Sequence, residues 1–144
     1  MQDPFNLERF VNAQAEVFDQ VVGELRAGEK LSHWIWFIFP QMKGLGHSSQ
    51  SMYFGIGSLE EAVAYLRHPV LGPRLGRCTR LATLVEGRTI RQILGYPDDL
   101  KFRSSMTLFA HAAVHASMDS TVFNDALKKY FEGEPDSLTV ALLL

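Results

Sequence analysis

The sequence predicts a mostly α-helical protein that folds as a single compact domain over residues 1–144. Three observations support this fold class. Apolar residues recur at helical spacing along most of the chain, residues typical of helix ends punctuate that pattern, and a length of 144 residues with 47% apolar content suits one core. We expect about six or seven helices around a buried aromatic segment, Trp34 to Phe39.

Composition narrows the classes of partner. A net charge of -2 and a pI near 6.2 lack the basic excess typical of nucleic-acid binding, so no nucleic-acid partner is expected. The longest apolar run, Trp34 to Pro40, is too short to span a bilayer, so no membrane is expected either. A single cysteine, Cys78, and an N-terminus without signal-peptide character favour a cytoplasmic protein.

The first predicted helix runs from Asn6, a favourable N-cap residue, to Gly28, a natural C-terminal stop. Between them, one face of the helix is mainly apolar, and it carries Leu7, Phe10, Val11, Gln14, Phe18, Val21, Val22 and Leu25. The opposite face is charged, which predicts an amphipathic surface helix.

The segment from Trp34 to Phe39 is apolar at every position, so its periodicity does not separate a buried strand from a buried helical turn. Its residue types favour a strand, but the one candidate partner is Met52 to Ile56, and an isolated pair of strands is marginally stable. We therefore predict a short buried helix, which Pro40 ends.

Two helices are predicted after this segment. Ser58 and Glu61 have the spacing of a capping box, and the helix that they begin should stop near His68. Pro69 suits the first turn of the next helix, which Gly87 closes. The buried stripe of that helix is Leu71, Leu75, Cys78, Leu81, Ala82 and Val85.

The C-terminal half continues in the same manner. A short helix is predicted from Thr89 to Leu94, ended by Gly95, and a long one from Asp98 to about Ser117. Asp119 or Ser120 then caps a helix that ends at Gly133, and Asp136 or Ser137 begins a last turn through Leu143.

One face of the helix from Asp98 is polar in an unusual way. It carries small hydroxyl side chains beside one lysine instead of the long charged residues of an ordinary solvated face, and its members are Lys101, Ser104, Ser105, Thr107, His111 and His115. We interpret this face as the lining of a ligand pocket. His111 and His115 have metal-ligand spacing, but no further ligand is evident, so no metal and no cofactor are predicted.

Polar residues also bracket the aromatic segment. His33 precedes it, and the residues after Pro40 include two glycines that permit positive φ angles and close backbone approach. The members of this second polar group are Gln41, Lys43, Gly44, Gly46, His47, Ser48 and Ser49. The glycine spacing does not match a P-loop or a dinucleotide fingerprint.

Three segments of the chain together form a specific pattern: His33-Trp34-Ile35-Trp36-Phe37-Ile38-Phe39-Pro40-Gln41, His68-Pro69-Val70-Leu71-Gly72 and Ser104-Ser105-Met106-Thr107-Leu108-Phe109. This pattern resembles the domain-of-unknown-function 1810 family, and the similarity extends from Leu7-Glu8-Arg9-Phe10 to Asp136-Ser137-Leu138-Thr139. The resemblance implies a mostly helical domain and no particular activity. Some members carry the label calpastatin, which does not suit this chain, because such inhibitors are disordered until bound and this one has an apolar core.

The leading functional hypothesis is a small-molecule-binding protein or enzyme. Its pocket would accept an anionic or nucleotide-like ligand where the Gly44 to Ser49 loop meets the Lys101 to His111 face, with Trp34 or Trp36 as a wall. His33 and His47 are the candidates for acid–base catalysis, and no reaction is assigned.

Two alternatives remain open. The first is a non-catalytic interaction domain or homodimer, which would use the apolar terminus Val140 to Leu144 and tyrosines such as Tyr53 and Tyr130. The second is that the polar residues form a buried hydrogen-bond network that only specifies the fold.

Overall fold

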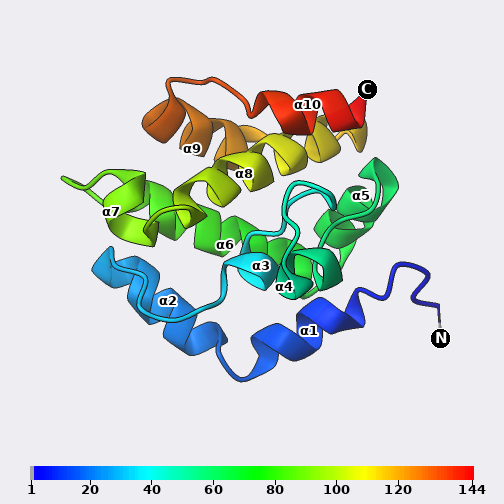
Figure 1. Cartoon of the computed structure of the whole chain (residues 1–144), viewed down its shortest axis with the longest axis horizontal. Helices are drawn as coiled ribbons and strands as arrows, with labels where there is room; N and C mark the ends of the chain where they lie inside the picture. The colour runs from blue at the N-terminus through cyan, green and yellow to red at the C-terminus, as the bar shows by residue number, and fades with distance from the viewer. Residues whose placement is uncertain (1) are drawn as a thin grey trace.

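A computed structural model describes residues 2–144, which form ten helices (Figure 1). In chain order they are α1 (Glu8–Ala15), α2 (Phe18–Ala27), α3 (Ile35–Ile38), α4 (Ser49–Tyr53), α5 (Leu59–Arg67), α6 (Leu71–Leu84), α7 (Ile90–Leu94), α8 (Asp98–His115), α9 (Thr121–Phe131) and α10 (Ser137–Leu143). The mostly α single-domain prediction is confirmed, although the helices outnumber the six or seven expected.

The long helix α8 lies at the centre of the molecule (Figure 1). It packs against α3, α5, α7, α9 and α10, while α6 packs against α2, α5 and α9. Most of its residues from Phe102 to Ala113 are buried, because neighbours cover it on several sides. Its polar face is therefore largely internal, and this decides which of its side chains can reach a ligand.

The predicted helix from Asn6 to Gly28 is two helices, which is a correction to the sequence analysis. The backbone breaks at Glu16 and Val17, so that α1 packs against α3 and α2 against α6. Asn6 is not the N-cap: it has a φ of 53°, and the Asp3 carboxylate accepts hydrogen bonds from the first backbone N–H groups instead. Gly28 ends α2 with a φ of 72°, as predicted.

The aromatic segment forms the predicted short helix, α3. Its two ends are fully buried, and the Phe39 ring meets the Phe102 ring of α8 edge to face, with centroids 4.8 Å apart. The chain after Pro40 then pairs with residue Ile56 through a single parallel bridge at Met42. This bridge lies outside Trp34 to Phe39, so within the described residues 2–144 that segment forms no strand pair with Met52 to Ile56.

Several predicted helix ends are confirmed. The Ser58 hydroxyl caps α5 by accepting from the Glu61 N–H, although the Glu61 carboxylate bonds to Gly57 and not to Ser58. Thr89 and Gln92 form a full capping box on α7, and the Asp136 carboxylate caps α10. The helix α6 ends at Leu84, before Gly87.

The helix α4 was not predicted. The Ser48 hydroxyl caps it by accepting from the Ser51 N–H, but its sequence, Ser49-Gln50-Ser51-Met52-Tyr53, has no apolar periodicity. This helix, together with the division of the first predicted helix, raises the number of helices above six or seven. Apolar periodicity reports neither feature.

Candidate functional site

A crevice lies between α3 and α8, and of the predicted Gly44 to Ser49 loop and Lys101 to His111 face only Lys101 lines it. We call it the Trp36 crevice. It holds about 10 Å³ of free space and is lined by Ile35, Trp36, Phe39, Gln41, Ser51, Phe54, Gly55 and Lys101. Three of the predicted binding residues, Trp36, Gln41 and Lys101, therefore meet in space although 60 or so positions separate α3 from α8.

Lys101 provides the positive charge of the Trp36 crevice. Its Nζ lies 5.3 Å from the centroid of the Trp36 ring, which is cation–π distance. Its nearest carboxylate oxygen, on Asp98, is 3.7 Å away, whereas the same carboxylate lies 2.8 Å from Lys30 Nζ. Because Asp98 is shared between two lysines and is closer to Lys30, this neighbourhood retains an excess of positive charge.

Two buried hydrogen-bond donors near this helix pair have no partner. They are the Trp36 indole Nε1 and the Ser105 hydroxyl, which lies one turn beyond Lys101 on α8. Buried polar atoms are nearly always hydrogen-bonded, and leaving one unpaired costs about 1–3 kcal/mol. An indole N–H can only donate, so an incoming group that satisfies it must be an acceptor.

The loop after Pro40 contributes Gln41 to the lining of the crevice. Gly44 adopts a φ of 104°, which confirms the expected positive φ, while Gly46 serves close approach: a Cβ there would lie 2.5 Å from the Ser51 hydroxyl oxygen. Gly55 is equally restricted, with Lys43 atoms 2.7 Å from an added Cβ. Gly46 thus brings the loop close to α4, and Gly55 brings the segment after α4 close to Lys43.

Four predicted residues of the α8 face do not line the Trp36 crevice, namely Ser105, described above, and Ser104, Thr107 and His111. The Ser104 hydroxyl donates to the Leu100 carbonyl, and the buried Thr107 hydroxyl donates to the Arg103 carbonyl and accepts from the Asp136 N–H. His111 is exposed and lines a different hollow beside Leu143 of α10. The C-terminal part of this polar face, with Thr107 and His111, therefore lies beside α10 and not beside the loop after Pro40.

Trp34 does not line the Trp36 crevice either, because its side chain is buried against Glu24 of α2. Its indole Nε1 donates to the Glu24 carboxylate over 2.9 Å, and the N–H groups of Leu31 and Ser32 donate to the same oxygen. Burial alone raises the pKa of the Glu24 carboxyl, but the hydrogen bonds from Ser32, Leu31 and Trp34 outweigh it and lower the pKa to about 2. This arrangement fixes the segment that leads into α3.

The remaining candidates among the polar residues before and after the aromatic segment lie at the surface. His33, Lys43, His47, Ser48 and Ser49 are all exposed. The Ser48 hydroxyl caps α4, and the other four side chains are exposed to solvent. Within residues 2–144, no three His, Cys, Asp or Glu side chains are grouped as metal ligands.

Sequence reasoning missed Ser51, Phe54 and Gly55, which complete the Trp36 crevice. They sit in and after α4, a segment with no periodic pattern. The signal available for Gly55 was its place between two apolar residues, which is typical of a close backbone approach. Ser51 offered none, because a serine in a polar segment is usually exposed.

Fold and site together define a helical domain with a small, partly basic aromatic crevice. The chain belongs to the DUF1810 family, proteins of unknown function, whose model matches residues 4–143. The chain is also similar to the conserved hypothetical protein Rv1873 from Mycobacterium tuberculosis. The two are 56% identical over 98% of each chain, with a TM-score of 0.94.

A comparison with curated proteins gave no match. None of the helices in residues 2–144 is both long enough and apolar enough to cross a membrane.

Proposed function

We propose that the protein binds a small anionic ligand, whose acceptor group enters the Trp36 crevice. The observation that carries the proposal is the combination of Lys101 over the Trp36 ring with a buried Trp36 Nε1–H that lacks an acceptor. Lysine and an indole N–H are both pure donors, and an anionic oxygen is the group that pairs with both.

The size of the Trp36 crevice limits what enters it. Its free volume is only about 10 Å³, close to what a single water needs and far below the 300–1,000 Å³ of typical ligand pockets. One oxygen of a carboxylate or phosphate would therefore enter the crevice, and the rest of a nucleotide-like ligand would lie along the exposed loop that carries Lys43, Ser48 and Ser49. His33 and His47 remain the acid–base candidates if the ligand is also a substrate.

The test is the affinity of Lys101→Met for a panel of anions, with acetate, inorganic phosphate and AMP as probes. Methionine keeps the apolar stem over Trp36 and removes the charge, so at least tenfold weaker binding of the preferred probe is expected by calorimetry. Lys128→Met, at an exposed position on α9, is the matched control. Equal affinity of the wild type and Lys101→Met would refute the proposal.

Ser105→Ala separates a binding role from a structural one. The Ser105 hydroxyl is buried without a partner, so its removal should leave the melting temperature unchanged or slightly higher. If the hydroxyl serves the ligand, affinity falls while stability does not. A large loss of stability would instead identify Ser105 as part of the packing.

A second candidate function is association through an apolar surface at the C-terminus. Leu138, Leu142 and Leu144 of the last helix and its end are 65%, 49% and 102% exposed, and Val114 of α8 is 67% exposed. Exposed apolar residues in such number on adjoining helices are typical of interaction surfaces. This supports a homodimer or a protein partner as the alternative.

A cytoplasmic location is part of the proposal. It is supported by the one cysteine, Cys78, which is buried and unpaired, as suits a reducing compartment. Burial raises the pKa of the Cys78 thiol to about 12, so the proposed activity assigns no nucleophilic role to it.

A further inference from the structure

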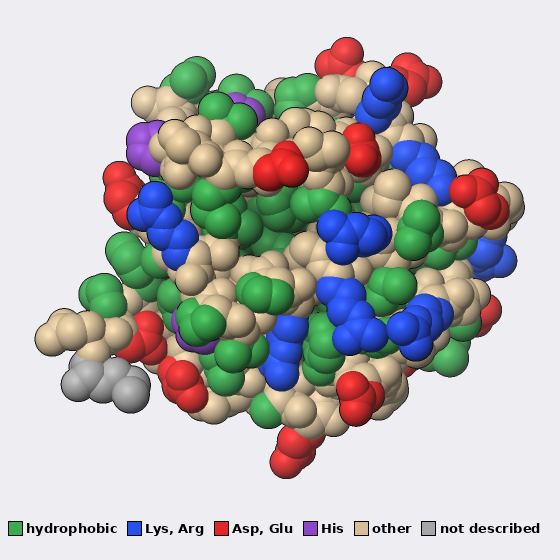
Figure 2. All heavy atoms as spheres, turned by 180° about the vertical axis from the view of Figure 1, so that it is seen from behind, with side chains coloured by type: hydrophobic (Ala, Val, Ile, Leu, Met, Phe, Trp, Pro, Cys, Tyr) green, Lys and Arg blue, Asp and Glu red, His purple; other side chains and the backbone are tan. Residues whose placement is uncertain are grey.

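Positive charge is concentrated on one helix of this weakly acidic protein. Residues 67–91, which contain α6, hold six arginines and one acidic residue, Glu86, in a chain whose net charge is -2. Three of these arginines follow each other at intervals of three residues along α6: Arg74, Arg77 and Arg80, which we call the arginine stripe. Figure 2 shows basic side chains gathered near the middle of the rear face, below a recess with a hydrophobic floor.

Two guanidinium groups of the arginine stripe are held over a single phenyl ring. The guanidinium carbons of Arg74 and Arg77 lie 4.7 Å and 5.9 Å from the centroid of the Phe18 ring on α2. Arg74 is fixed further by donating to the side-chain oxygen of Gln14, over 3.4 Å. Gln14 is buried and donates in turn to the Phe37 carbonyl, so the anchor of Arg74 reaches into the core.

No carboxylate within residues 2–144 lies within ion-pair distance of this group. The ion pairs formed within residues 2–144 involve Arg9, Lys30, Lys101 and Lys129, and none includes a member of the arginine stripe. Glu16 and Asp19, which are close to Phe18 in sequence, are exposed and form no ion pair with the arginine stripe. Like charges held together without a counter-ion repel each other, and an anion that binds between them removes that repulsion.

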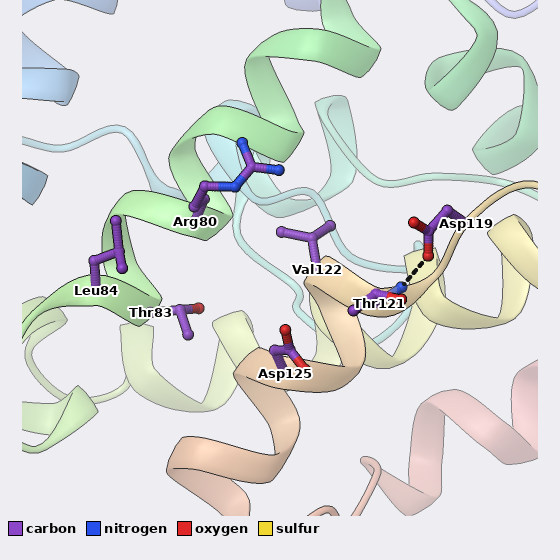
Figure 3. A pocket seen from close by; sticks show the side chains of 7 residues that line it. All are labelled: Arg80, Thr83, Leu84, Asp119, Thr121, Val122 and Asp125. Atoms are coloured by element: carbon purple, nitrogen blue, oxygen red, sulfur yellow. Dashed lines mark hydrogen bonds between the residues drawn. The ribbon is translucent and has the colours of Figure 1, made fainter.

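The third arginine borders a hollow between α6 and α9. This α6–α9 hollow has a volume of about 520 Å³ and is lined by Arg80, Thr83, Leu84, Asp119, Thr121, Val122 and Asp125. Figure 3 shows Arg80 on one wall, Asp119 and Asp125 on the other, and Val122 between them. The hollow therefore offers hydroxyl and carboxylate acceptors beside the arginine stripe, which suits the hydroxyl-bearing part of a ligand.

We propose that the arginine stripe binds the phosphate group of a small phosphorylated ligand, whose remaining part lies in the α6–α9 hollow. The presence of arginines favours phosphate as the bound anion, because the planar guanidinium group donates two parallel hydrogen bonds to two phosphate oxygens. All three positive side chains of the stripe are arginines, and two are already oriented by Phe18. This site shares no residue with the Trp36 crevice.

The test uses inorganic pyrophosphate as the probe and calorimetry at about 0.15 M salt, an ionic strength that screens non-specific attraction beyond about 8 Å. Arg77→Gln and Arg80→Gln change exposed residues, so both variants should keep the wild-type melting temperature. Each is expected to weaken pyrophosphate binding at least tenfold. Lys128→Gln removes the same charge from an exposed position on α9 and should change the affinity less than twofold.

Two outcomes would overturn the proposal. One is the absence of measurable pyrophosphate binding, and the other is an equal loss in Lys128→Gln, which would show general charge attraction. Lys101→Met distinguishes this site from the Trp36 crevice, because pyrophosphate bound at the arginine stripe must survive that substitution. If Lys101→Met abolishes binding while Arg77→Gln does not, the crevice stands and the stripe fails.

A labelled 12-nucleotide oligo-dT, followed by fluorescence anisotropy, identifies the source of the phosphate. If the natural ligand is a small molecule, the oligonucleotide should bind no more tightly than pyrophosphate does. Tighter, strongly salt-dependent binding that Arg77→Gln removes would assign the phosphates to a nucleic-acid backbone and overturn the small-ligand proposal.

Discussion

Single buried polar side chains hold distant segments of this protein together. Gln14 joins α1 to the Phe37 carbonyl and the Tyr65 hydroxyl, and Arg9 donates to the Gly55 carbonyl and the Glu61 carboxylate. Each of these side chains is buried or partly buried and its partners are far away in sequence. Their role is to orient elements, which apolar packing alone does less specifically.

Glu24 is the residue at which this principle is most easily tested. Its pKa of about 2 lies below the ordinary value of 4.5, so as the pH falls the unfolded chain takes up a proton before the folded protein does. The stabilisation is complete above about pH 4.5 and is lost as the pH falls towards 2. Glu24→Gln should therefore lose about 2 kcal/mol of unfolding free energy at pH 7, the typical contribution of hydrogen bonds to a charged group.

Urea unfolding at pH 7 and pH 3 checks this prediction. The wild type should lose more stability than Glu24→Gln between the two pH values, so that the difference between them shrinks in acid. Glu29→Gln, which alters an exposed acid of the same segment, is the control and should follow the wild type. An undiminished difference at pH 3 would show that the ionised carboxylate is not the cause.

At the scale of the elements, the junction between α5 and α6 depends on a glycine. A Cβ at Gly72 would lie 2.1 Å from the Leu66 carbonyl oxygen, whereas a Cβ at Gly76, one turn later in the same helix, would meet no atom within 4 Å. Side-chain size is thus decisive at one position and irrelevant at the other. The difference arises because the first turn of α6 crosses the last turn of α5.

Alanine substitutions at these two glycines should have opposite effects. Gly72→Ala forces the two backbones apart and is expected to cost about 2–3 kcal/mol, in the range of overpacked cores. Gly76→Ala removes the helix penalty of glycine and should add about 0.5–1 kcal/mol. Thermal unfolding of both variants measures this, and a destabilised Gly76→Ala variant would contradict the open space seen at that position.

At the scale of the whole molecule, the apolar C-terminal surface is the feature that a partner would cover. Thr107 of α8 accepts a hydrogen bond from the Asp136 N–H and so ties the start of α10 to the core. The far end of α10 carries Leu142 and Leu144, which are 49% and 102% exposed. Packing within one chain therefore buries Thr139 and part of Leu143 and leaves Leu142 and Leu144 exposed.

Deletion of residues 140–144 tests the association that this surface suggests. If the surface forms a homodimer, light scattering should show a dimer for the full chain as concentration rises and a monomer for the shortened one. Circular dichroism is the control for folding, because the buried Thr139 and the α10 cap remain in the shortened chain. A full-length protein that stays monomeric at high concentration would remove the homodimer from consideration.

Much of the fold was predictable from the sequence because its signals are local. The capping serine at Ser58, the capping box at Thr89 and the positive φ of Gly28 each depend on a few neighbouring residues. The break at Val17 was not predictable, since the apolar spacing continues through it and only the different partners of α1 and α2 separate the two helices.

The candidate site divides in the same way. The sequence by itself determined that Trp36, Gln41 and Lys101 are chemically suited to a pocket, because residue type and spacing are local properties. Only the tertiary structure decided that these three meet, that Trp34 serves Glu24 and that Thr107 serves α10. The physical reason is that contact between segments distant in sequence depends on helix packing, and burial converts the same polar side chain into either a ligand contact or a structural bond.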